Sequence, residues 1–229
     1  MFWYIDPVYL WLALIIFVIS TAVQLYLRNT YAKWGNVRNG AGLTGMQVGQ
    51  TLYDRTSLEA IPIERTPGVL SDHFDPGTNV VRLSEAVADQ PSVGAMAVTA
   101  HELGHVQQYQ TGSALIKARG FLLPALQFSP TLSYIAILLG LWFNMTGMLW
   151  LGIIFFALMV LFSILTLPVE IDASRRGTRL LQEAGLMRSD ADAQGSKAVL
   201  TAAGLTYLAA AITSILQLLY YISIANRRR

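Results

Sequence analysis

The chain has 229 residues, of which 54% are hydrophobic and only 13% are charged. An average soluble domain carries about 25% charged residues, so this composition argues against an ordinary soluble protein and favours a membrane protein. The net charge of +2 shows no basic surface of the kind that binds nucleic acid. The absence of cysteine excludes disulfides and thiolate metal ligands.

The first uncharged stretch, residues 7–27, is long enough to cross a bilayer, which takes about 20 helical residues. It is preceded by Asp6 rather than by basic residues, and Arg28 follows it without a small-residue cleavage site. These flanks favour a retained anchor over a cleaved signal peptide. The sequence therefore predicts a transmembrane helix over 7–27.

The polar segment that follows, residues 28–119, is predicted to form a small α+β subdomain against the membrane. Thr44 is a candidate N-cap for a short helix. Alternating β-branched residues on both sides of an Asp-Pro-Gly turn predict a β-hairpin with strands over 68–74 and 79–83. This hairpin either offers an edge strand to an extended peptide or simply covers the helix after it. The pattern leaves both interpretations open.

A proline-free segment, residues 92–111, contains the pattern His101-Glu102-Leu103-Gly104-His105. In a helix, residues i and i+4 share one face, so the imidazoles of His101 and His105 can bind a single metal ion. Glu102 lies beside the first of these ligands, where its carboxylate can take a proton from a water without binding the metal. The pattern therefore predicts the site of a zinc hydrolase, with Glu102 as its base.

The second uncharged stretch, residues 120–169, is long enough for two crossings and must turn between them. The polar and glycine-containing segment 144–147 is the natural place for the turn, flanked by Trp142 and Trp150 at interfacial depth. The sequence thus predicts transmembrane helices over 120–143 and 148–169.

A second polar segment, residues 170–197, is predicted to begin as a continuation of the third membrane helix and to be stopped by Gly185. Ser189 or Asp190 then caps a final transmembrane helix over 198–226. The expected fold is a single membrane metallopeptidase domain over 1–229. It is mainly α, with about four transmembrane helices and a small α+β cytoplasmic subdomain that carries a β-hairpin.

The distribution of basic residues predicts the orientation. All but three of the 16 lysines and arginines lie in 28–119 and 175–197, so the positive-inside rule places both polar segments in the cytoplasm. The other three, Arg227–Arg229, would lie outside if 198–226 crosses fully. Either that helix re-enters or follows the interface, or the tail is a local exception. We favour the exception.

The third ligand has to be found elsewhere in the chain, because a catalytic zinc site takes three protein ligands and one open position. A third histidine six residues beyond His105 is excluded, since that position is Thr111. The remaining histidine, His73, lies upstream. Five carboxylates follow the motif, namely Glu170, Asp172, Glu183, Asp190 and Asp192.

Topology favours Glu170 among these carboxylates. Two crossings separate Arg119 from Glu170, so both ends of the helical hairpin return to the same face of the membrane. A carboxylate at a membrane boundary is costly unless it is paired or bound to metal. We therefore predict Glu170 as the third ligand, with Asp172 as the alternative. A simple ion pair between Glu170 and Arg175 or Arg176 is the non-functional interpretation.

Three motifs carry a family resemblance: Leu70–Pro76, the H-E-x-x-H pattern with Gln108, and Pro168–Arg176. Together they resemble the YugP-type membrane zinc metallopeptidases of bacteria. The resemblance covers nearly the whole chain and implies a neutral zinc peptidase in the bacterial plasma membrane. It also implies His101 and His105 as ligands and Glu102 as the catalytic residue.

More remotely, the chain is similar to membrane gluzincins such as HtpX, whose third ligand is the glutamate of E-x-x-A-D. Glu170 and Ala173 match that pattern, but Ser174 stands where the pattern has aspartate. Because that aspartate orients a ligand histidine, Asp172 or Ser174 is expected to substitute for it here.

The resulting prediction is a Zn²⁺-dependent membrane endopeptidase that cleaves peptides or membrane proteins at the cytoplasmic face of the bilayer. The oxyanion of the reaction needs a donor besides zinc. His73 is the candidate, with Arg82 and Tyr109 as alternatives, unless His73 is merely a polar hairpin residue. The competing class is a non-catalytic zinc-binding membrane subunit or scaffold. No nucleic-acid partner is expected, and protein partners and oligomeric state are not predicted.

Overall fold

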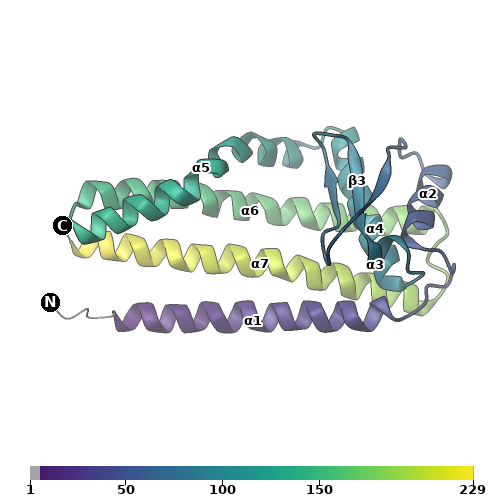
Figure 1. The fold of residues 1–229 in the computed structure, drawn as a ribbon, viewed down its shortest axis with the longest axis horizontal. Helices are drawn as coiled ribbons and strands as arrows, with labels where there is room; N and C mark the ends of the chain where they lie inside the picture. Colours follow the sequence, from purple (N-terminus) through teal and green to yellow (C-terminus); the bar gives the residue numbers. More distant parts are fainter. Residues whose placement is uncertain (1–5, 229) are drawn as a thin grey trace. The chain divides into compact units, whose positions relative to one another are not determined.

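The computed structural model describes residues 6–228, and these are mainly helical. The helices are α1 (Pro7–Gly35), α2 (Gly45–Arg55), α3 (Glu85–Ala88), α4 (Val93–Gln110), α5 (Ala114–Trp142), α6 (Thr146–Glu183) and α7 (Asp190–Arg227). One small sheet within these residues is formed by β1 (Ile63–Thr66), β2 (His73–Asp75) and β3 (Val80–Ser84) (Figure 1). The predicted fold class, mainly α with a small α+β part, is confirmed.

Four helices, α1, α5, α6 and α7, are long and apolar enough to cross a membrane. α1, α6 and α7 each contain one of the segments predicted as transmembrane, and α5 contains all of its segment except residue 143. Helices α1, α6 and α7 continue well beyond the apolar residues into polar sequence. The long apolar stretch turns where expected, between Trp142 and Thr146. Asn144 supports this turn with a φ of 54°, a left-handed conformation that asparagine tolerates better than most residues.

The chain divides into two compact units. The first contains the chain up to Val23 together with Lys117–Pro168 and Thr206–Arg229. The second contains Gln24–Ile116 and Val169–Leu205, and therefore the sheet, α2, α3, α4 and the polar extensions of three long helices. That residues 1–229 form a single domain stays a prediction.

The second unit is built around α4, which is enclosed on almost every side. Leu103 and Met96 of α4 are fully buried in one hydrophobic core. Partners in this core come from α2, β3 and α6, including Leu52, Leu83 and Leu180. Ser92 caps α4 by accepting a hydrogen bond from the amide of Ala95, and the predicted cap of α2, Thr44, is also observed.

The predicted hairpin is confirmed, but its first strand is shorter than expected. β2 pairs antiparallel with β3, in the register His73↔Arg82 and Asp75↔Val80. Residues 68–72 lie outside the strands, because the backbone takes positive φ at Gly68 (106°) and Leu70 (58°) and so cannot continue a ladder. An additional strand that was not predicted, β1, pairs parallel with β3, so β3 is central and β2 is an edge strand.

Candidate metal centre

Two glycines let α4 and α6 pack backbone against backbone. A Cβ atom at Gly104 of α4 would overlap the carbonyl oxygen of Ala173, and one at Gly177 of α6 would overlap that of Ala100. Any side chain at either position would force the helices apart. This close approach is what brings the H-E-x-x-H helix against the segment of α6 that carries Glu170.

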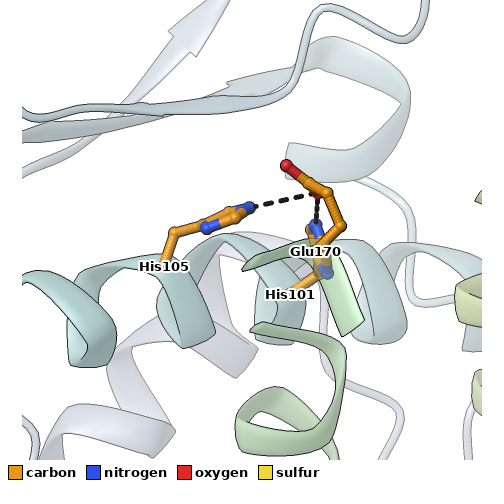
Figure 2. A group of neighbouring side chains, drawn as sticks. All are labelled: His101, His105 and Glu170. Carbon is orange, nitrogen blue, oxygen red and sulfur yellow. Dashed lines mark hydrogen bonds and ion pairs between the residues drawn. The ribbon is translucent and has the colours of Figure 1, made fainter. Parts of the chain in front are cut away.

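The three predicted ligand residues come together at this contact. The Nε2 atoms of His101 and His105 lie 3.2 Å and 3.4 Å from the same oxygen, Oε2 of Glu170. Figure 2 shows both imidazoles of α4 directed at this carboxylate, which is only 3% exposed. One ligand atom from each of the three residues lies within 4.8 Å of the others.

This arrangement fits a tetrahedral zinc ion. Zinc binds imidazole nitrogen and carboxylate oxygen at about 2.0–2.2 Å, which separates two ligand atoms by about 3.4 Å at a tetrahedral angle. The two measured nitrogen–oxygen separations are of this size. Two imidazoles and one carboxylate also supply three protein ligands, which leaves a fourth position of a tetrahedron for a small molecule.

The far nitrogen of each imidazole is held by a neighbouring side chain. Nδ1 of His101 is hydrogen-bonded to Oγ of Ser174 at 3.1 Å, and Nδ1 of His105 to Oε1 of Gln108 at 3.0 Å. An amide oxygen only accepts hydrogen bonds, so Nδ1 of His105 is the donor, and Nε2 is the nitrogen that faces the metal position. Metal-binding histidines are generally oriented in this way by their other nitrogen.

Gln108 connects His105 to the carboxylate that was the alternative ligand. Its Nε2 donates to Oδ2 of Asp172 at 2.7 Å and to the carbonyl oxygen of Val169 at 2.9 Å. Nε of Arg176 donates to the same Asp172 oxygen at 2.8 Å. The structure therefore places Asp172 behind Gln108, outside the three-residue cluster, and Arg176 pairs with Asp172 instead of Glu170.

Glu102 is a residue of α4 that contacts the edge strand of the sheet. It is 7% exposed, and its Oε2 accepts a hydrogen bond of 2.9 Å from the backbone amide of Phe74 in β2. Because this amide donates to Glu102, the edge strand is tied directly to α4. The carboxylate is thus held at the edge strand beside the two histidines, outside the three-residue cluster.

The three candidate oxyanion donors lie on or against the hairpin, and each has a different partner. His73 is exposed, with Nδ1 bonded to the carbonyl oxygen of Ser71 at 2.8 Å. Arg82 forms an ion pair of 3.0 Å with Asp75. The hydroxyl of Thr78 and, next, the guanidinium of Arg82 lower the pKa of Asp75. Tyr109 packs edge-on against Phe74, which brings its ring close to the residue that contacts Glu102. The role of His73 remains a prediction.

The negative charges around His105 favour its protonated form. Burial alone would lower its pKa, but the hydrogen bond to Glu170 and the charges of Glu102 and Glu170 outweigh burial and raise the pKa. Such a surplus of negative charge around buried imidazoles is what a divalent cation neutralises.

Sequence reasoning missed two members of this site. The bridging role of Gln108 could have been suspected, because it lies three residues after His105 and so on the same face of α4. The amide of Phe74 carries no sequence signal, since any residue except proline supplies one. Ser174, one of the two predicted substitutes for the missing aspartate, lies against His101.

An H-E-x-x-H helix, a glutamate from a later helix and four apolar helices define the class of membrane metallopeptidases. Residues 9–226 match the family described as "Putative neutral zinc metallopeptidase", and the chain belongs to this family. It is 34% identical over 206 residues to a Bacillus subtilis (strain 168) protein named "Putative membrane protease YugP". This similarity covers 90% of the chain and 91% of the relative. No solved structure matches the chain.

Proposed function

We propose that this protein is a zinc-dependent membrane endopeptidase with His101, His105 and Glu170 as metal ligands. The observation that carries the proposal is the convergence of both imidazole Nε2 atoms on one oxygen of Glu170. When bound there, zinc supplies a Lewis acid that makes water acidic enough to act as a nucleophile near neutral pH.

Glu102 is the proposed general base. Its carboxylate is one residue from the first ligand, and the Phe74 amide bond fixes one of its oxygens. The carboxylate accepts the proton of the attacking water and then returns it to the leaving amine.

The edge of β2 is the proposed place for the peptide. β2 has β3 on one side only, and on the other side its Phe74 amide reaches Glu102. An extended substrate can add to such an edge by backbone hydrogen bonds, largely independent of its sequence. In this proposal the hairpin both covers α4, through the bond from the Phe74 amide to Glu102, and offers the rest of its edge to a peptide.

The proposed substrates are membrane proteins or peptides at the cytoplasmic face of the bacterial plasma membrane. The basic residues concentrate in the two polar segments that form the second unit, which supports a cytoplasmic location. The Bacillus relative is named as a putative membrane protease, which supports a membrane setting.

Zinc content and proteolysis of the purified protein, compared between wild type and Glu102→Gln, test the proposal. We expect the variant to retain zinc and to lose cleavage of a model membrane protein. Glu183→Gln is the matched control, because Glu183 is an exposed glutamate at the end of α6 and should leave both properties unchanged.

Cleavage that survives in Glu102→Gln would refute the role of this carboxylate. If wild-type protein holds zinc but cleaves no substrate, including misfolded membrane proteins, the alternative of a non-catalytic zinc-binding subunit takes precedence.

A further inference from the structure

The two ends of the β-hairpin differ sharply in chemistry. The turn between β2 and β3 consists of Pro76–Asn79 and is polar, with Asp75 accepting hydrogen bonds from Gly77 and Thr78. The connection between β1 and β2 lies at the other end of the sheet, because Thr66 pairs with Ser84 and His73 with Arg82, and it contains the apolar pair Val69-Leu70. Ser71 closes this connection by donating to the carbonyl oxygen of Pro67 at 3.0 Å.

Val69 and Leu70 are the only exposed aliphatic side chains of substantial size among the described residues between Arg28 and Gly112. Val69 is 85% exposed and Leu70 is 46% exposed. Single apolar residues on a surface are ordinary. Two adjacent exposed residues are less ordinary in this segment, because its other large aliphatic side chains are buried or half-buried. Such a pair fits a surface that contacts a partner or a membrane.

The loop lies beside the part of α1 that follows the apolar stretch. Val69 and Leu70 line a cavity of about 480 Å³ together with Arg28 and Tyr31 of α1. Arg28 is the first charged residue after 7–27, and it marks the place where α1 leaves the hydrocarbon. Tyr31 lies three residues further along α1, which is about 4.5 Å along a helix axis.

These distances fit the thickness of the headgroup layer. The polar region adds about 5–7 Å to each side of the hydrocarbon core, so a side chain level with Arg28 or Tyr31 lies within it. Arginine side chains such as the exposed Arg28 are typical of this depth, where they contact lipid phosphates.

We propose that Val69 and Leu70 insert into the membrane interface beside α1, so that the β1–β2 connection is a lipid-contacting loop. β2 begins three residues after Leu70, and its Phe74 amide contacts Glu102. The loop therefore fixes the height of this strand edge above the lipid. The membrane contact itself does not depend on the proposed peptidase function.

The cysteine-free sequence allows a direct test. Val69→Cys is labelled with an environment-sensitive fluorophore in full-length protein reconstituted into phosphatidylethanolamine–phosphatidylglycerol vesicles. Pro76→Cys, in the exposed turn at the opposite end of the hairpin, is the matched control. We expect nitroxide-labelled phospholipid to quench the probe at position 69 at least about twofold more than the probe at position 76.

Leu70→Asn provides a second variant, because asparagine tolerates the positive φ at this position but removes the apolar side chain. Combined with Val69→Cys, it should reduce the quenching at position 69. Equal quenching at positions 69 and 76 would overturn the proposal. A blue-shifted probe that lipid nitroxides do not quench would also overturn it and would indicate that a protein covers the loop.

Discussion

Helices α4 and α1 are both largely apolar, but they are covered by different partners. All but four of the 18 residues of α4 are buried within the protein, whereas only Leu27 and Thr30 are buried among the 29 residues of α1. α4 is rich in glycine and alanine, which permit close helix packing, while α1 exposes large residues such as Trp11 and Phe17. The size of each side chain therefore matters along α4, where neighbouring elements pack closely. Along α1, the side chains need chiefly to be apolar.

The largest effect is expected from a substitution of Glu170, the carboxylate that faces the two histidines of α4. We expect Glu170→Gln to lower zinc affinity by more than the roughly 10–100-fold that loss of a supporting outer residue costs. The reason is that an amide is a much poorer zinc ligand than the carboxylate now facing both imidazoles. Zinc stoichiometry after dialysis, measured by atomic emission, reports the loss.

Asp172→Asn is the matched control, because this residue contacts Gln108 and Arg176 instead of the histidines. It should weaken zinc binding less than Glu170→Gln does. The reverse order would make Asp172 the third ligand.

The close packing of α4 is tested by Gly104→Ala. The new methyl group would overlap the backbone of α6, which cannot yield as a flexible side chain would. We expect the free energy of unfolding to fall by about 1–3 kcal/mol or more. Gly204→Ala, in α7 of the same unit, has open space around its Cβ position and should be neutral or stabilise by up to about 1 kcal/mol.

Thermal unfolding in detergent, followed by circular dichroism, compares these two variants. If both glycine substitutions have the same effect, the close α4–α6 contact does not limit stability.

Gln108 and Ser174, which are hydrogen-bonded to the two ligand histidines, are expected to affect zinc affinity less than Glu170 does. Gln108→Leu removes the acceptor that orients His105 and the donor to Asp172 and Val169. We expect zinc affinity, measured by competition with a chelator, to fall roughly 10–100-fold. Ser174→Ala removes one hydrogen bond to His101 and should have a smaller effect. Unchanged affinity in Gln108→Leu would mean that packing alone orients His105.

Sequence patterns predicted those parts of the molecule that repeat or obey a simple chemical rule. Hydropathy located the four long apolar helices, and helical periodicity placed His101 and His105 on one face. Glu170 was predicted to lie near the histidines because two crossings return the chain to the same face of the membrane. That inference needed only chain length and the cost of a charge at a membrane boundary.

The remainder depends on backbone contacts that no side-chain pattern encodes. β1 was missed because its register with β3 is set by parallel pairing between distant segments. The expected strand over 68–74 was too long because Gly68 and Leu70 turn the backbone. Likewise, nothing in the sequence around Gly104 indicates that this glycine faces the backbone of another helix.

The smallest effect is expected on the exposed side of α1. Phe17 is 66% exposed, and in detergent its ring contacts hydrocarbon whether the protein is folded or not. Phe17→Ala should therefore change the free energy of unfolding by less than about 0.5 kcal/mol. Leu103→Ala in the enclosed helix should cost about 2–5 kcal/mol, because it leaves a cavity in a packed core. A cost for Phe17→Ala close to that of Leu103→Ala would mean that protein covers this face of α1, and the two helices would no longer differ in kind.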